Sequence, residues 1–465
     1  MNALQRDLKR LVPLIEKLEA PKAASDPHRQ QFHIQPPVGW LNDPNGLCKV
    51  GDTYHVFYQY SPFNPNGGVK MWAHVTSRDL LHWEQQPVML YPDEPFDCHG
   101  AYSGSALYED GKLWLFYTGN IKLPGDYDHI NTGRENNLCL ATSQDCIAID
   151  TKECLLHNRD YPAGLSCHVR DPKVWAQDGR YYLVLGARTE DSRGEVLVFE
   201  SEDKRSWRHC NTITTPEPMG YMWECPDLFE LEGQWYLMAS PQGYECQNVY
   251  GCGYFPLYGD FRGGCRLGDF HLLDYGFDYY APQSFTDGVR RLQLGWMGMP
   301  DAPYTNPTAD YGWQHCMTVP RELTLASDGS LLQTPAQELK TLRGEAISLV
   351  PSATLSVDPC FELTAAPLGS FCLTVAEGLV LTYHESSRTV SLQFTDPSIS
   401  GGRKERHLVL DIPCRSLQVV ADTSSLEIFL NGGSFVMSTR YFPAPGLVPV
   451  RINGTSATLW PLVLS

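Results

Sequence analysis

A three-residue motif that precedes a turn glycine recurs five times in the first two thirds of the chain, and it constrains the fold more than any other feature. The middle residue lies eight positions before the glycine in four copies and seven in the last. The motifs are Asn42-Asp43-Pro44 before Gly51, Tyr102-Ser103-Gly104 before Gly111, Arg170-Asp171-Pro172 before Gly179, Glu224-Cys225-Pro226 before Gly233 and Tyr280-Ala281-Pro282 before Gly288. Aromatic runs such as YHVFYQY and LWLFYT follow the glycines, which are 54 to 68 residues apart. Strand repeats of this period indicate a β-propeller, and we predict five blades.

Three of the motifs carry a carboxylate, namely Asp43, Asp171 and Glu224. The strand before each turn glycine should be the innermost of its blade and begin at the mouth of a central channel. We therefore expect the three acids to converge on one axial pocket. In isolation Asp-Pro and Asn-Gly are ordinary turn chemistry. The shared register favours a catalytic site over that interpretation.

Segments of different character flank the repeats. Residues 1–24 have leucines and an isoleucine at spacings of three and four, typical of an amphipathic helix packed on the protein body, with Pro13 expected to kink or split it. The propeller is predicted over residues 25–335. Short alternating runs over 346–465 predict a separate β-sandwich. The predicted class is all-β: a five-bladed β-propeller, then a C-terminal β-sandwich, with a short N-terminal amphipathic helix. The sandwich could form a homodimer or simply brace the propeller.

Composition excludes several classes of partner. A net charge of −18 argues against nucleic acid and anionic membrane surfaces. No apolar stretch is long enough for a transmembrane helix, and charges in residues 1–20 interrupt any signal-peptide core. Fifteen cysteines without a C-x-x-C pair indicate reduced thiols rather than a disulfide framework or a zinc site. We expect a cytoplasmic protein that needs no metal and no cofactor.

Paired carboxylates can cleave a bond to an acetal carbon through an oxocarbenium-like transition state. In a retaining reaction one stays ionised as nucleophile, while the other acts first as acid and then as base. Apolar residues before Glu224 favour a protonated acid, and amides around Asp43 favour an ionised carboxylate. Arg170 should keep Asp171 charged and oriented. Spacing alone leaves the assignment of these roles open.

With these residues in place, the chain resembles glycoside hydrolase family 32, the invertase family. Four motifs carry the resemblance in the family's order: WLNDPNG at 40–46, YSGSA at 102–106, RDP at 170–172 and ECP at 224–226. It covers about residues 30–465 and implies a five-bladed propeller joined to a β-sandwich.

The resemblance also implies roles for individual residues. Asp43 would be the nucleophile on the anomeric carbon of a β-fructofuranosyl unit, Glu224 the acid/base, and Asp171 a stabiliser that binds fructosyl hydroxyls beside Arg170. Trp313 would line the rim of the pocket. The implied substrate-binding positions are Trp40, Leu41, Asn42, Gln59, Trp72, Tyr102, Ser103, Arg170, Tyr280 and Trp313.

The chain departs from the family pattern at the rim. Gly67-Gly68 stands where many members have Trp-Gly, and Ala73 follows Trp72 where glycine is usual. These changes predict an altered affinity and leaving-group preference. A phosphorylated substrate would need cationic side chains at the rim. Lys70, Arg134 and His99 lie in suitable loops, although each is more simply interpreted as a solvated residue.

The leading hypothesis is a retaining β-fructofuranosidase that acts on a small sugar, either sucrose or sucrose 6-phosphate. A fructan or fructo-oligosaccharide hydrolase, or a fructosyltransferase, would use the same covalent intermediate and differ in its outer subsites. A non-catalytic sugar-binding propeller is the hypothesis from another class. The presence of both Asp43 and Glu224 argues against it.

Overall fold

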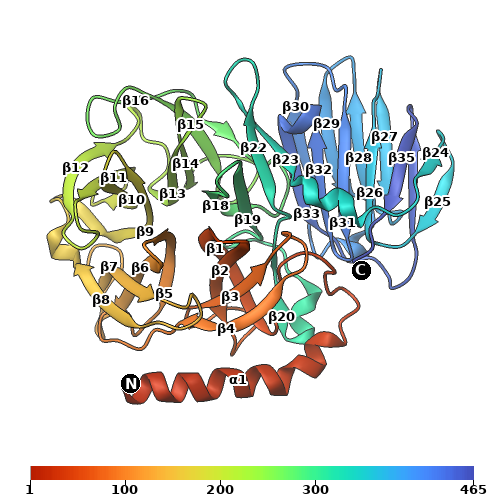
Figure 1. Cartoon of the computed structure of the whole chain (residues 1–465). Coiled ribbons are helices and arrows are strands. Elements are labelled where there is room, and N and C mark those ends of the chain that lie inside the picture. Colours follow the sequence, from red (N-terminus) through yellow and green to blue (C-terminus); the bar gives the residue numbers. More distant parts are fainter. Residues whose placement is uncertain (1, 465) are drawn as a thin grey trace.

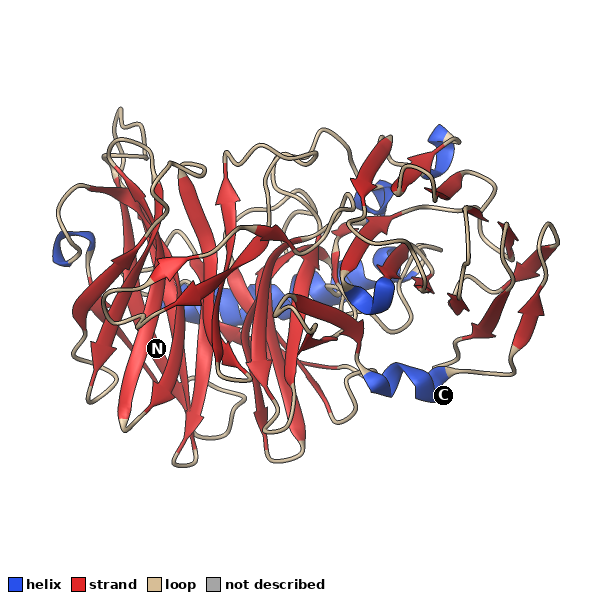
Figure 2. Cartoon of the chain, turned by 90° about the horizontal axis from the view of Figure 1, so that it is seen from above, coloured by secondary structure: helices blue, strands red, loops and turns tan. Residues whose placement is uncertain are grey.

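The computed structural model describes residues 2–464 and consists mainly of strands, as the predicted all-β class requires. Figure 1 shows five sheets around a common centre and two further sheets packed beside them toward the C-terminus. In the view from above, the long helix passes behind the strands of the first group (Figure 2). The acidic motifs all lie in the first group of sheets.

Each of the five sheets begins with two long strands joined by a tight turn. The first sheet holds β1 (Gly39–Val50), β2 (Thr53–Ser61), β3 (Met71–Ser77), β4 (Glu84–Leu90) and β20 (Trp313–Gln314). The second holds β5 (Ala101–Glu109), β6 (Lys112–Lys122), β7 (Arg134–Ser143) and β8 (Thr151–Leu156). The third holds β9 (Leu165–Gln177), β10 (Arg180–Thr189), β11 (Gly194–Ser201) and β12 (Arg208–Ile213).

The last two sheets complete the ring. The fourth holds β13 (Met222–Leu231), β14 (Gln234–Gln242), β15 (Gly253–Tyr258), β16 (Arg266–Leu267) and β17 (His271–Leu272). The fifth holds β18 (Tyr280–Thr286), β19 (Arg291–Met297), β21 (Cys316–Met317), β22 (Arg321–Leu325) and β23 (Leu331–Pro335). Strand β20 leaves the fifth sheet and pairs in parallel with β1, with Trp40 opposite Gln314. This pairing ties the end of the ring to its beginning.

The turn between the first two strands of each sheet requires a left-handed backbone. The five turn glycines have φ between +57° at Gly51 and +94° at Gly288, and a Cβ at any of them would meet no atom within 4 Å. Glycine is therefore needed for conformation and not for space. In three turns the residue before the glycine also has positive φ, namely Asp110, Asp178 and Glu232. Two successive positive φ values fit type I′ hairpin turns, which match the twist of the strands.

The two remaining sheets, of six strands each, enclose a separate apolar core. One holds β24 (Ile347–Leu349), β35 (Ala457–Pro461), β26 (Phe361–Ala365), β31 (Leu417–Asp422), β32 (Ser425–Leu430) and β33 (Phe435–Arg440). The other holds β25 (Thr354–Val357), β34 (Val448–Asn453), β27 (Phe371–Val375), β28 (Leu379–His384), β29 (Thr389–Phe394) and β30 (Glu405–Val409). Short 3₁₀ helices lie at Asn158–Asp160, Pro307–Tyr311, Gln337–Leu342, Pro397–Ile399 and Asn431–Gly433.

Helix α1 (Ala3–Ala24) packs along the outside of the ring (Figure 1). Pro13 lies inside it and does not divide it. The predicted apolar stripe is confirmed in part: Leu8 and Ile15 are half-buried and pack on the core, whereas Leu4, Leu11 and Leu18 are exposed. Val12, which lies outside the predicted stripe, is the fully buried residue between Leu8 and Ile15.

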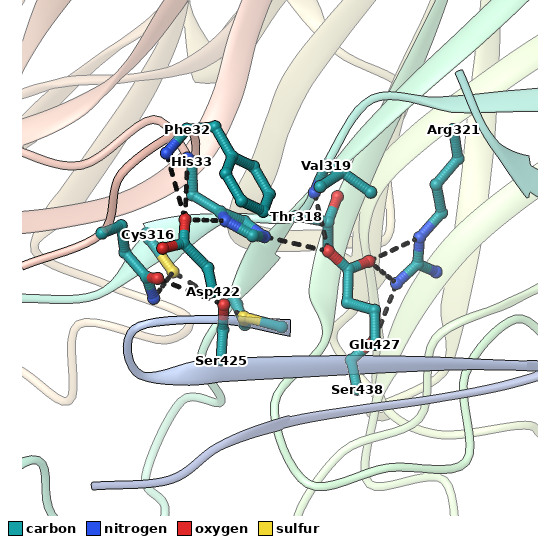
Figure 3. A network of polar contacts seen from close by, with 12 residues as sticks. Phe32, His33, Cys316, Thr318, Val319, Arg321, Asp422, Ser425, Glu427 and Ser438 are labelled. Atoms are coloured by element: carbon teal, nitrogen blue, oxygen red, sulfur yellow. Dashed lines mark hydrogen bonds and ion pairs between the residues drawn. The ribbon is translucent and has the colours of Figure 1, made fainter. Parts of the chain in front are cut away.

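A buried charged network joins the N-terminal segment, the ring and the sandwich (Figure 3). Arg321 of β22 donates to Glu427 of β32 at 2.7 Å. The His33 ring lies between Asp422, at 2.8 Å, and Glu427, at 3.1 Å. Although burial opposes a charge on His33, its bonds to Asp422 and Glu427 raise its pKa to about 9. This ion network fixes the sandwich against the ring.

Candidate active site

All five motifs coincide with a β-bulge, where the first strand of a sheet loses register with the second. In β1 the register shifts between Leu41 and Pro44, and in β13 between Glu224 and Asp227. The other three shifts, in β5, β9 and β18, also fall at the motif. A bulge redirects side chains out of the regular alternation. The sequence repeat is therefore a repeated bulge in five neighbouring sheets.

The middle residue of three motifs has a left-handed backbone. The φ angles are +66° at Asp171, +48° at Cys225 and +48° at Ala281. This region is disfavoured for residues with a Cβ by about 1–2 kcal/mol. Such strain persists where the surrounding structure enforces it, and it is concentrated at functional sites.

The middle residues of four motifs form one cluster at the centre of the ring. Ser103 Oγ donates to Asp43 Oδ2 at 2.6 Å. Cys225 Sγ lies 3.7 Å from Asp43 Oδ2 and 3.7 Å from Asp171 Oδ2. The backbone N–H of Cys225 donates to Asp171 Oδ2 at 3.0 Å. Two carboxylates that are 128 positions apart in the chain thus share one thiol neighbour.

The cluster of middle residues is the first tier of the site. The residues one position before them in the motifs form a second tier. Arg170 Nη2 donates to Glu224 Oε1 at 2.5 Å, and Tyr280 Oη donates to Glu224 Oε2 at 2.7 Å. Both oxygens of Glu224 are held, while 16% of its side chain stays exposed. Because Glu224 precedes Cys225, it occupies a different tier from Asp43. The two acids therefore have different partners within one site.

A chain of amide and hydroxyl groups orients Asp43. Trp40 Nε1 donates to Asn42 Oδ1 at 2.8 Å, and Asn42 Nδ2 donates to Gln59 Oε1 at 2.8 Å. Gln59 Nε2 then donates to Ser103 Oγ at 2.6 Å. Since Ser103 already accepts this hydrogen bond, its own hydrogen is directed at Asp43. The polar residues of the WLNDPNG motif thus support the carboxylate that the motif contains.

The electrostatics differ from the prediction. Burial raises the pKa of Asp43, although the hydrogen bonds from Ser103 and Asn42 oppose that rise. Burial also raises the pKa of Asp171 to about 7, against the opposing charge of Arg170. Arg170 does not hold Asp171 firmly ionised because its closest acid is Glu224, whereas Asp171 is 3.8 Å from Nε. Desolvation therefore dominates both carboxylates of the first tier.

Three predicted contact residues are buried in packing positions. Leu41 is fully buried in the apolar core, because it faces away from its neighbours Trp40 and Asn42. Trp313 does not line a rim: it is fully buried and donates to Asp26 at 2.8 Å. Trp72 is also fully buried, and its Nε1 donates to the Tyr102 carbonyl at 2.9 Å. Trp72 therefore supports the YSGSA motif from behind, while Tyr102 itself stays half-buried.

Lys70 takes the space at the rim that the glycine at position 67 leaves open. Its Nζ lies 4.9 Å from the centre of the Trp40 ring, and a Cβ at Gly67 would lie 3.6 Å from it. Burial lowers the pKa of Lys70 to about 8, with the charge of Asp43 opposing. His99 lies in the turn before β5, where its Nδ1 accepts from the Lys122 backbone N–H at 3.2 Å.

Sequence reasoning did not single out His168. Its Nδ1 lies 2.5 Å from Arg170 Nη1, and its Nε2 lies 3.2 Å from Arg134 Nη1. Burial and then the charge of Arg170 lower its pKa to about 3, so the ring is neutral. The available signal was the spacing of two from Arg170, which places both side chains on one face of β9.

The other end of the ring contains a cavity of about 640 Å³. Its lining comes from the later parts of the same inner strands and includes Lys49, Lys173 and Glu230. Asp43, Asp171 and Glu224 are not part of that lining. Among residues 2–464, no group of three His, Cys, Asp or Glu side chains is placed to hold a metal ion. No helix in the described part of the chain is long and apolar enough to cross a membrane.

Comparison with known proteins gives consistent matches along the chain. The model of the glycosyl hydrolases family 32 N-terminal domain matches residues 33–335, and that of the family 32 C-terminal domain matches 326–460. A sucrose-6-phosphate hydrolase of Bacillus subtilis is 39% identical over 98% of this chain and 97% of its own. One from Klebsiella pneumoniae is 41% identical over 92% of this chain and 91% of its own.

Solved structures give the same result. The sucrose-6-phosphate hydrolase from Lactobacillus gasseri superposes with a TM-score of 0.89 and 28% identity, covering 97% of this chain and 96% of that one. A β-fructofuranosidase from Bombyx mori superposes with a TM-score of 0.86 and 28% identity, covering 97% of this chain and 98% of that one.

Proposed function

Because the chain belongs to glycosyl hydrolase family 32, we propose that it cleaves the β-fructofuranosyl bond of sucrose 6-phosphate and of sucrose with retention of configuration. The observation that carries this proposal is the separation of the acids into two tiers, with Asp43 held by Ser103 and Glu224 held by Arg170 and Tyr280. The names of the Bacillus and Klebsiella relatives support the choice of substrate.

The chemistry requires two steps. In the first, the Asp43 carboxylate attacks the anomeric carbon of the fructosyl unit while Glu224 donates a proton to the glycosidic oxygen. The bond to the glucosyl unit breaks, and an ester joins fructose to Asp43. In the second, Glu224 removes a proton from water, and the resulting hydroxide displaces Asp43 to release fructose. Glu224 is then protonated again and Asp43 is ionised.

Asp171 and Asn42 would bind fructosyl hydroxyls beside the nucleophile. Asp171 shares Cys225 with Asp43, and Asn42 donates to Asp43 Oδ1 at 3.1 Å. A carboxylate with a pKa of about 7 can accept or donate a hydrogen bond to a hydroxyl. We assign to both a role in orienting the sugar rather than in bond cleavage.

We also propose how the chain is divided. Residues 25–335 would form a five-bladed propeller with one sheet per blade, residues 346–465 a sandwich, and residues 1–24 an N-terminal helical segment. The boundaries of the two family matches support this division. The buried bond between Arg321 and Glu427 favours a bracing role for the sandwich.

The test is glucose 6-phosphate release from sucrose 6-phosphate and glucose release from sucrose. We expect Asp43→Asn and Glu224→Gln to lower both rates by more than about a hundredfold. With β-fructofuranosyl fluoride, whose leaving group needs no proton, Glu224→Gln should still give a burst of fluoride, while Asp43→Asn should give none. Equal bursts from the two variants would overturn the assignment of roles. Thermal melting of each variant serves as the folding control.

A further inference from the structure

A cationic cluster lies beside Glu224, and apart from Arg170 its members are not used in the chemistry above. It consists of Arg170, His168 and Arg134, in which the His168 ring lies between the two guanidinium groups. Arg188 of β10 joins it, because it follows Ala187, which pairs with Val169 of β9, and its charge acts on His168. The arginine cluster is defined here as Arg134, Arg170 and Arg188 with His168.

Two members of the arginine cluster have no acidic partner. Within the described residues, neither Arg134 nor Arg188 has a carboxylate within ion-pair distance, whereas Arg170 is paired with Glu224. The Nε atoms of Arg134 and Arg188 are buried and have no hydrogen-bond partner in the part of the chain that the structure describes. The His168 ring is neutral, so it does not balance the charge of the two guanidinium groups. Buried donors without partners are costly, so this arrangement favours an anion.

The rest of the chain makes the cluster more unusual. The protein carries a net charge of −18, yet the Arg134 and Arg188 guanidinium groups have no acid among residues 2–464 to neutralise them. The Arg188 guanidinium lies 4.7 Å above the Tyr221 ring, in the segment that leads to Glu224. Stacking fixes the plane of a guanidinium. Arg188 Nη2 donates to Ser192 Oγ at 2.8 Å, and the remaining N–H groups of the guanidinium are left for an anion. Phosphate is an anion that such groups bind well.

The position of the arginine cluster identifies which part of the substrate carries the anion. Glu224 protonates the glycosidic oxygen in the proposed function, so the departing glucosyl unit must lie next to Glu224. From Glu224 the contacts lead through Arg170 to His168 and Arg134. We propose, on the premise of that function, that Arg134 and Arg188 bind the phosphate on the glucosyl unit of sucrose 6-phosphate. They are specificity residues and take no part in bond cleavage.

Lys70 is the competing candidate for the phosphate. It lies beside Trp40 and its charge acts on Asp43, the residue that attacks the fructosyl unit. A cation at that place would bind a group on fructose rather than on glucose. The arginine cluster and Lys70 therefore predict different effects on substrates phosphorylated on different rings.

The experiment compares kcat/KM for sucrose 6-phosphate with kcat/KM for sucrose in Arg134→Gln, Arg188→Gln and the double variant. We expect each single change to lower the value for the phosphorylated sugar tenfold or more and the value for sucrose less than threefold. Inhibition by glucose 6-phosphate should weaken in parallel. Arg134→Lys, which keeps the charge, should recover part of the loss.

Arg180→Gln is the matched control, since Arg180 begins the same strand β10 and pairs with Glu200 and Glu202 at its other end. It should change neither value. Retained preference for the phosphorylated sugar in the double variant, or loss of preference in Lys70→Met instead, would overturn the assignment. Equal losses on both sugars would do the same. Failure of the native enzyme to cleave either sugar would instead refute the proposed function.

Discussion

Removing the Ser103 hydroxyl should shift the pH at which the enzyme loses activity in acid. The hydroxyl donates to Asp43 at 2.6 Å, and this bond favours the ionised carboxylate against burial, which raises the pKa of Asp43. A hydrogen bond to a charged group contributes about 1.5–3 kcal/mol. At 1.36 kcal/mol per pH unit, Ser103→Ala should raise the pKa of Asp43 by about one to two units.

The measurement is the pH profile of kcat/KM for sucrose, which reports ionisations of the free enzyme. The acidic limb should move to higher pH by that amount, since the group whose pKa rises must be deprotonated to attack. Ser105→Ala is the matched control, because Ser105 lies two residues later on β5 and donates to the Pro172 carbonyl at 2.8 Å. It should leave the limb in place. An acidic limb that does not move in Ser103→Ala would refute the orienting chain of hydrogen bonds.

Two further predictions concern Glu224 and the domain network. Tyr280→Phe removes the 2.7 Å hydrogen bond to Glu224 and should lower kcat/KM at least about tenfold. Tyr279→Phe is the control, because the Tyr279 phenol donates to Gln293 instead, and it should not lower kcat/KM. Equal effects of the two variants would contradict this prediction. The pKa of His33 is raised to about 9 in the folded protein, so its contribution to stability is full below pH 6.5 and is lost as the pH rises through 9. The free energy of unfolding measured in urea should fall by about 3 kcal/mol over that pH range, and this fall should be absent in His33→Gln. If the native protein and the variant showed the same dependence on pH, the prediction would be contradicted.

The repeat predicted which residues lie at the centre of the ring, because each bulge motif lies at the same distance from its turn glycine. Asp-Pro, Cys-Pro and Ala-Pro at the bulges of β9, β13 and β18 share that distance to within one residue. Residues at one depth in neighbouring sheets must meet at the axis. For this reason the sequence alone predicted that Asp43 and Asp171 lie close together.

Membership of a motif did not predict which face a residue occupies. Leu41 lies in the WLNDPNG motif and Trp313 was an implied rim residue, yet Leu41 is in the core and Trp313 is buried and donates to Asp26. Strand alternation predicts the orientation of Leu41, since its neighbours Trp40 and Asn42 bond to each other. The approach of Arg134 and Arg188 to His168 was not predictable, because neither arginine belongs to a repeat and they reach His168 only when β7 and β10 pack against β9.

The two tiers follow from the bulge itself. In a regular strand, consecutive side chains point to opposite faces, so a sheet could offer the axis only one residue of each pair. At the bulges Arg170 and Asp171 both reach the site, as do Glu224 and the thiol of Cys225. The chain can therefore gather three carboxylates and a fixed cation in one cluster. Deleting one residue between a motif and its turn glycine would reverse the faces of the strand and separate these groups.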